Sequence, residues 1–307
     1  MLFRSLITSS LALASVAFAA PIDTTTDSTS DATVETYNAF VRPSMIVFGD
    51  SMSDNGNMPH YSNYSQYWGG RYSNSYMWNE YTAFLTNMKL ENYAIGGSTT
   101  DNSFVPAHGR TQLIPSVTDM VQQYIANNTN VSKFKKQYSL VFMDGGGNDI
   151  GYSADGLSNG SIDPTWFVTT LVANQMANIK RLLDAGYRNI YLINYPDAGG
   201  RISAALTGST YTPNPIISAV NNGFKSSLAA LKKSRSDASN VNMLDVDSMM
   251  TVILNADVLK AMNITSLYPP CADYSTNGEQ PVFCSDPDTR FLYDPSHPSG
   301  RIEYILG

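Results

Sequence analysis

The fold is decided by a stretch near the N-terminus that reads MIVFGDSMSDNG, residues 45–56. Its first four residues are apolar and of strand length, and glycine and polar residues follow at once. Further apolar runs of strand length occupy residues 92–95, 138–143, 189–194 and 241–246. Segments with the apolar spacing of helices lie between them, such as 113–126, 166–185 and 216–233. This alternation predicts one doubly wound α/β domain, with a parallel sheet covered on both faces.

The composition excludes several classes of function. Only 15% of the 307 residues are charged, and 19 basic against 26 acidic residues give a net charge of -7. The chain therefore lacks the basic surface that neutralises nucleic acid phosphates, and an anionic bilayer would repel it. We expect no nucleic acid partner and a neutral substrate.

The N-terminus has the pattern of an export signal. Residues 1–20 contain one early charge, Arg4, then an apolar stretch and the small residues Ala17 and Ala19. The apolar stretch is shorter than the roughly 20 residues that span a bilayer, so a cleavable signal peptide is predicted and no transmembrane segment. Residues 21–41 are rich in Thr, Ser and Asp, which predicts a disordered leader before a single domain at 42–307.

Other features agree with a secreted, extracellular protein. Five asparagines have Ser or Thr two residues on and are candidate glycosylation sites. They are Asn63, Asn127, Asn130, Asn159 and Asn263. The two cysteines, Cys271 and Cys284, would close a short loop in an oxidising compartment and stabilise the fold by roughly 2–4 kcal/mol. A pair of free thiols is the alternative.

Three of the predicted strands end in unusual polar segments. Residues 49–56, 96–100 and 144–149 are rich in Gly, Asp, Asn and Ser, and ligands of such folds bind beyond the strand ends. Each segment alone fits an ordinary turn. Together they supply a hydroxyl nucleophile, Ser51, and two candidates for donors to a developing oxyanion, Gly97 and Asn148. The backbone N–H of Ser51 is a third.

A serine nucleophile needs a base, and the chain has only three histidines. His297 follows Asp294 by three residues, so the carboxylate can reach the imidazole within one turn and orient it. His60 and His108 have no such neighbour and are predicted to be surface residues. The spacing predicts a triad of Ser51, His297 and Asp294, although a loop histidine with an incidental acid gives the same pattern.

Competing motifs do not fit the chain. The nucleophile motif G-x-S-x-G of α/β-hydrolases fails, because position 53 is Ser53 rather than glycine. The third glycine of a dinucleotide-binding G-x-G-x-x-G falls on Ile150. Cysteines and histidines are too few for a structural zinc site. We therefore predict no cofactor and no metal.

Four blocks of the sequence resemble the GDSL, or SGNH, hydrolases. They are Gly49-Asp50-Ser51, residues 92–97, Gly146-Gly147-Asn148-Asp149, and Asp294-Pro295-Ser296-His297. Their order and spacing are most similar to secreted fungal acetylesterases of carbohydrate esterase family 16 and to GDSL lipases. The resemblance implies an α/β/α sandwich with a five-stranded parallel sheet and a metal-free ester hydrolase.

The same resemblance implies a role for each residue. Ser51 is the nucleophile, His297 and Asp294 complete the triad, and Ser51, Gly97 and Asn148 form the oxyanion hole. By the same likeness, the neighbouring Asp50 and Asp149 hold turns rather than react. Met52 stands where the family name has leucine, a conservative change in volume.

The substrate is less well defined by sequence. We expect removal of short acyl groups, chiefly acetyl, from saccharides through an acyl-enzyme, by a protein that acts as a monomer on a small-molecule or oligosaccharide ester. A dense group of Tyr and Trp at 61–78 suits sugar faces, and equally suits a packed helical cap. The alternatives are a lipase or phospholipase that acts on longer acyl esters, and a noncatalytic secreted sugar-binding protein.

Overall fold

Five parallel strands form the sheet that carries the site. The computed structural model describes residues 43–57, 67–107, 113–274 and 281–307, all within the compact unit Val41–Gly307. The strands lie in the order β2-β1-β3-β4-β5. Their bounds are β1 Ser44–Phe48, β2 Lys89–Asn92, β3 Leu140–Met143, β4 Asn189–Ile193 and β5 Val241–Leu244. Every pair is parallel, so all five carboxyl ends lie at one edge.

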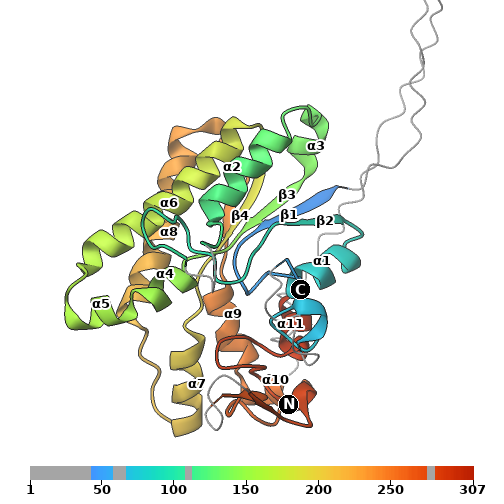
Figure 1. Cartoon of the computed structure of the whole chain (residues 1–307), viewed down its shortest axis with the longest axis vertical. Coiled ribbons are helices and arrows are strands. Elements are labelled where there is room, and N and C mark those ends of the chain that lie inside the picture. Colours follow the sequence, from blue (N-terminus) through green and yellow to red (C-terminus); the bar gives the residue numbers. More distant parts are fainter. Residues whose placement is uncertain (1–42, 58–66, 108–112, 275–280) are drawn as a thin grey trace, which may run out of the picture. The chain divides into compact units, whose positions relative to one another are not determined.

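Helices α2 (Val117–Asn127), α6 (Pro164–Asp184) and α8 (Pro215–Ser234) cover one face of the sheet (Figure 1). Apolar residues of these helices, such as Leu171 and Phe224, pack with Ile46 and Val141 of the central strands in the main core. Side chains that cap the N-termini fix where the long helices begin. Asp163 accepts from Trp166 N, and Asn214 accepts from Ile216 N and Ile217 N.

Helices α1 (Trp78–Leu85) and α11 (Gly300–Leu306) cover the other face. Trp78 of α1 and Leu306 of α11 pack against Val47 and Phe142, whose side chains point to this face of β1 and β3. Thus β1 is buried on both faces, which explains why its sequence is an unbroken apolar run.

The remaining helices of the described residues lie outside these two groups. They are α3 Lys133–Tyr138, α4 Gly147–Tyr152, α5 Ala154–Asn159, α7 Ala198–Thr207, α9 Val246–Ile253 and α10 Ala256–Ala261. Among the described residues, 3-10 turns lie at Trp68–Gly70, Ser236–Ala238 and Pro287–Thr289. Strands β6 (Ala272–Asp273) and β7 (Val282–Phe283) pair as a two-stranded antiparallel ribbon. In the part of the chain that the structure describes, no helix has the length and apolar character needed to cross a bilayer.

The α/β class and the five-stranded parallel sheet are as predicted, but one strand was misplaced. The apolar run at 92–95 overlaps β2 only at Asn92, because β2 is an edge strand whose residues Lys89 and Glu91 are charged. Glu91 accepts from Lys135 Nζ at 2.7 Å and from Ser44 Oγ at 2.9 Å, so this strand is held partly by polar contacts. Apolar periodicity cannot reveal such a strand.

Several sequence predictions fall outside the described residues. These are the signal peptide at 1–20, the leader at 21–41, His60, His108 and Asn63. The other four candidate glycosylation sites are exposed, as modification requires: Asn127, Asn130, Asn159 and Asn263.

Candidate active site

Ser51 lies in the turn that directly follows β1. Residues 51–53 form a turn and not the first turn of a helix. Asp54 N donates to Asp50 O at 3.0 Å, but the turn then opens, because Asp50 Oδ1 accepts from Met52 N and Asp54 Oδ1 accepts from Gly56 N. Such local side-chain acceptors compete with helical hydrogen bonds and hold the serine at the edge of the sheet.

In the structure, His297 lies between Ser51 and Asp294 and is within hydrogen-bonding distance of both side chains. His297 Nε2 lies 2.7 Å from Ser51 Oγ, although 246 residues separate them in sequence. On the other side of the ring, His297 Nδ1 lies 2.7 Å and 2.8 Å from the two carboxylate oxygens of Asp294. Asp294 Oδ1 also accepts from His297 N at 2.9 Å, so the carboxylate fixes both backbone and ring.

Two tyrosines of the aromatic group at 61–78, to which the sequence analysis gave no role in the triad, contact these residues. Tyr67 donates its hydroxyl to Asp294 Oδ2 at 3.1 Å, and Tyr72 packs its ring 4.8 Å from the ring of His297. Both tyrosines are buried. They limit the motion of Asp294 and His297, which is the preorganisation that a proton transfer needs.

The charges around His297 favour its protonated form. Burial lowers the pKa of His297, but the nearby charge of Asp294 and its hydrogen bond, together with the charge of Asp50, outweigh burial and raise the pKa above 6.5. In turn, burial raises the pKa of Asp294, and the His297 charge and hydrogen bonds more than offset this, so the pKa is lowered. The pair is therefore arranged to stabilise an imidazolium.

Asn148 and Gly97 lie at the ends of the two neighbouring strands. Asn148 is the second residue of α4, and its Nδ2 donates to Ser98 O at 2.9 Å and lies 3.3 Å from Asp50 Oδ2. These contacts place the amide beside the residue before Ser51 and the residue after Gly97. Gly97 has a φ of +86°, and a Cβ there would approach Ile114 Cδ1 to 2.8 Å, so glycine is required.

A second buried carboxyl group, Asp144, was missed by the sequence analysis. Its Oδ1 accepts from Asp50 N at 2.9 Å, and its Oδ2 accepts from Ser53 Oγ. Burial and the neighbouring charge of Asp50 raise the pKa of Asp144 to about 8. Burial also raises the pKa of Asp50. The site thus avoids collecting several negative charges next to Ser51.

Asp149 holds a turn, as the resemblance implies. Its carboxylate accepts from Thr100 N at 2.9 Å and from Thr100 Oγ1 at 2.6 Å, which ties the segment after β3 to the segment after β2. Burial raises the pKa of Asp149 to about 6.

A disulfide between Cys271 and Cys284 braces the segment that leads to Asp294. Cys271 N donates to Leu292 O at 3.1 Å, and Ala272 N donates to Tyr293 O at 2.6 Å. The bridge is therefore joined by backbone hydrogen bonds to the two residues before Asp294.

A cavity of about 290 Å³ opens beside Ser51 and His297. Residues at or after the ends of β1, β3, β4 and β5 line it, and Gly97 is not among the lining residues. Most of the residues that line it are apolar, including Trp78, Ile193, Leu244, Met249, Phe291 and Leu306. A volume close to 300 Å³ is at the lower end of the range for ligand cavities, and it equals the volume of about ten water molecules.

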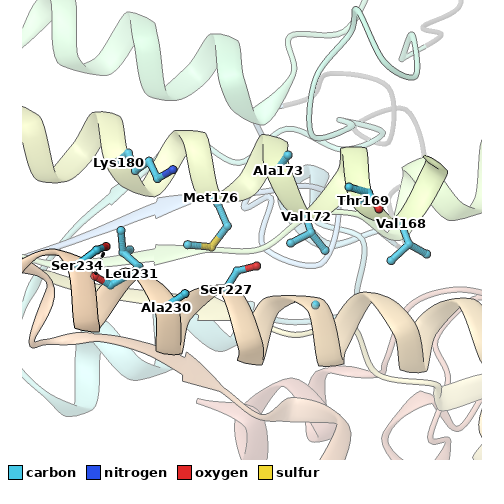
Figure 2. Close-up of a pocket in the computed structure, with 11 residues that line it drawn as sticks. Val168, Thr169, Val172, Ala173, Met176, Lys180, Ser227, Ala230, Leu231 and Ser234 are labelled. Carbon is cyan, nitrogen blue, oxygen red and sulfur yellow. Dashed lines mark hydrogen bonds between the residues drawn. The ribbon is translucent and has the colours of Figure 1, made fainter. Parts of the chain in front are cut away.

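A larger hollow, of about 600 Å³, lies between α6 and α8 (Figure 2). Val172 and Met176 point from α6 into it, and Ser227 faces them from α8. None of the three predicted triad residues lines this hollow. Ser51 and His297 line the smaller cavity instead, so the smaller cavity is the candidate substrate site. No group of three or more His, Cys, Asp or Glu residues suited to a metal occurs in the described ranges.

Comparisons with known proteins agree with this picture. The family model described as GDSL-like Lipase/Acylhydrolase matches residues 45–301. A thermolabile hemolysin of Vibrio parahaemolyticus serotype O3:K6 is 28% identical over 159 residues, which cover 50% of this chain and 34% of the hemolysin. The chain thus spans about a third of the length of that relative.

Solved structures with a similar fold include hydrolases. A family two carbohydrate esterase from Clostridium thermocellum has 15% identity and a TM-score of 0.43, covering 87% of this chain and 61% of that one. A phospholipase A1 from Streptomyces albidoflavus NA297 has 14% identity and a TM-score of 0.35, covering 87% and 96%. Similarity at this level does not bear on the substrate.

Proposed function

The chain belongs to the GDSL-like lipase/acylhydrolase family of carboxylic ester hydrolases, and we propose that it is a lipase-like esterase that transfers acyl chains longer than acetyl through Ser51. The contact of 2.7 Å between His297 Nε2 and Ser51 Oγ carries this proposal, because it gives a buried hydroxyl an oriented base. The apolar cavity beside that hydroxyl supports the choice of acyl group.

The reaction has two steps in this proposal. His297 Nε2 accepts the Ser51 proton while Oγ attacks the ester carbonyl, and the imidazolium then protonates the departing alcohol, which leaves an acyl-enzyme. A water molecule attacks this acyl group, His297 takes its proton, and Ser51 recovers its hydrogen as the acid leaves. Asp294 stays ionised and holds the ring.

Three donors are proposed to stabilise the oxyanion: the backbone N–H groups of Ser51 and Gly97 and the side-chain amide of Asn148. Ser98 O fixes the amide at 2.9 Å, so little reorganisation is needed when charge develops on the carbonyl oxygen. The raised pKa of Asp144 supports this role, since it disfavours a further carboxylate next to Ser51, which would oppose an oxyanion.

The cavity favours longer acyl chains than the sequence suggested. Acetyl has one methyl group beyond its carbonyl and would leave most of the 290 Å³ unfilled. Each buried methylene contributes about 0.8 kcal/mol, so a chain that fills the apolar walls gains affinity with length until the cavity is full. This observation supports the lipase-like alternative over an acetylesterase.

Chain-length profiling tests the proposal. We expect kcat/KM for p-nitrophenyl esters to rise from acetate to hexanoate or octanoate and to fall at palmitate, with no hydrolysis by Ser51→Ala. A maximum at acetate would support an acetylesterase instead. Failure to react with a fluorophosphonate, together with no turnover of any ester, would support the noncatalytic sugar-binding alternative. Secretion and the monomeric state stay predictions of the sequence.

A further inference from the structure

Large aromatic and apolar side chains, all exposed except the half-buried Tyr81, lie on α1 and α11 and on the segment that precedes α1. We call it the aromatic surface. Its members are Trp68, Tyr76, Tyr81, Phe84, Leu85 and Tyr304. Phe84 is 83% exposed, Leu85 60%, Tyr304 55%, Tyr76 46% and Trp68 40%. Soluble proteins seldom leave contiguous side chains of this size without a partner.

Ring contacts join four of the six members, Trp68, Tyr76, Tyr81 and Tyr304. The ring centroids of Trp68 and Tyr76 are 4.3 Å apart, those of Tyr76 and Tyr81 5.8 Å, and those of Tyr81 and Tyr304 5.2 Å. Phe84 and Leu85 follow Tyr81 by three and four residues on α1, so they share its face of the helix. The surface therefore runs along α1 and reaches α11.

The aromatic surface and the apolar cavity are built on the same two helices. Trp78 of α1 and Leu306 of α11 line the cavity, whereas Tyr304 of α11 is exposed and Tyr81 of α1 is half-buried with its ring against that of Tyr304. A partner that touches the outer side therefore lies next to the part of the protein that would receive an acyl chain.

The geometry of the rings opposes a sugar ligand. Sugars stack on open ring faces, but the three ring pairs are edge-to-face, with interplanar angles of 73°, 75° and 87°. In addition, the Arg71 guanidinium lies over Trp68, 4.4 Å from the ring centroid. The faces that a saccharide would need are partly covered by neighbouring side chains.

The charge of the region opposes an anionic partner. Arg71 is held by Glu80 through two hydrogen bonds of 2.7 Å, so its charge is neutralised within the surface. The whole chain has a net charge of -7 and would be repelled by anionic lipids. Trp and Tyr with exposed Phe and Leu are the composition that binds at the boundary of lipid and water.

We propose that the aromatic surface docks this protein on an electrically neutral lipid surface, with Phe84 and Leu85 inserted among the lipids and the tyrosines at the boundary with water. The role of this docking rests on the proposed lipase-like function, because docking would bring the apolar cavity close to acyl esters held in a lipid phase. Its test is independent of catalysis.

Sedimentation with large vesicles of pure phosphatidylcholine measures the docking. The full chain carries Ser51→Ala, so that no lipid is hydrolysed during the measurement. We expect the protein to sediment with the vesicles, and the double variant Phe84→Ser/Leu85→Ser to lose at least tenfold in partition coefficient. Phe134→Ser is the matched control: Phe134 is 57% exposed on α3 and lies outside the aromatic surface, and its loss should change partition by less than twofold.

Three results would overturn the proposal. They are a protein that stays in the supernatant, equal losses in the double variant and the control, and binding that requires phosphatidylglycerol in the vesicles. Hydrolysis of soluble p-nitrophenyl butyrate by the same surface variants with Ser51 restored is the second measurement and should stay within twofold of the original. If no variant and no unmodified protein hydrolyses any ester while vesicle binding persists, the proposed function fails and the docking surface stands.

Discussion

The two sides of Ser51 have opposite chemistry. Toward the ends of β1, β2 and β3 lie Asp50, Gly97 and Asn148, and the Asn148 amide donates to Asp50 Oδ2 and to the backbone beside Gly97. Toward the ends of β4 and β5 lie Ile193, Leu244 and the apolar wall of the cavity. The difference suggests a division of labour, in which the polar side determines how fast any ester reacts and the apolar side determines which ester is bound.

Replacing the shared nucleophile should have the largest effect. Ser51→Ala removes Oγ, the nucleophile that every ester must meet, and loss of the nucleophile in a triad lowers kcat about 10⁶-fold. We expect a loss of this order in steady-state hydrolysis of every chain length. Ser227→Ala is the control, because Ser227 lines the hollow between α6 and α8 and should leave the rate unchanged. Comparable turnover by both variants would contradict the assignment of Ser51.

The polar side is tested by Asn148→Ala. Removing one oxyanion donor costs about 10²–10³ in kcat in a related site. Because the oxyanion is the same for every ester, the loss should be equal for acetate and octanoate, with KM little changed. Asn159→Ala, an exposed asparagine on α5, is the control. A loss that depends on chain length would show that Asn148 acts through acyl binding instead.

The two sides also differ in how far the sequence could predict them. Asp294 and His297 are three residues apart, and Ser51, Gly97 and Asn148 each follow a strand closely, so strand order alone brings them to one edge. The apolar wall combines Ile193, Leu244, Phe291 and other residues from segments with ordinary core composition, and nothing in their local pattern separates a cavity from a packed core.

Some polar contacts were equally invisible in the sequence. Asp144 was noted only as part of a turn, and its raised pKa depends on burial beside Asp50, which is 94 residues away. The contact of Tyr67 with Asp294 spans 227 residues. Long-range contacts of this kind have no spacing that a single sequence could reveal.

The apolar side is tested by Ala198→Phe. Ala198 begins α7 and lines the cavity, so a phenyl ring there takes up room that a long acyl chain needs. We expect kcat/KM for octanoate to fall roughly 10–100-fold, the range that steric exclusion from an apolar pocket gives, with acetate almost unchanged. Ala205→Phe on the same helix is exposed and serves as the control. Equal losses for acetate and octanoate would refute the division of labour.

The smallest effect should come from removing the charge of Asp50, which lies on the polar side and raises the pKa of His297. The base must be neutral to accept a proton, so kcat/KM should fall about tenfold per pH unit below the His297 pKa. That pKa is raised by Asp294 and Asp50 against the opposing effect of burial, so the acid limb should lie above pH 6.5. Asp50→Asn keeps an oxygen that can accept from Met52 N but removes the negative charge of the carboxylate. The imidazolium is then less stabilised, so the acid limb should move to lower pH.

The measurement is kcat/KM for acetate and octanoate from pH 5 to 9, and the shift should be the same for both esters. An unchanged limb would show that the Asp50 charge does not reach His297, whereas a shift for one ester alone would assign Asp50 to the apolar side.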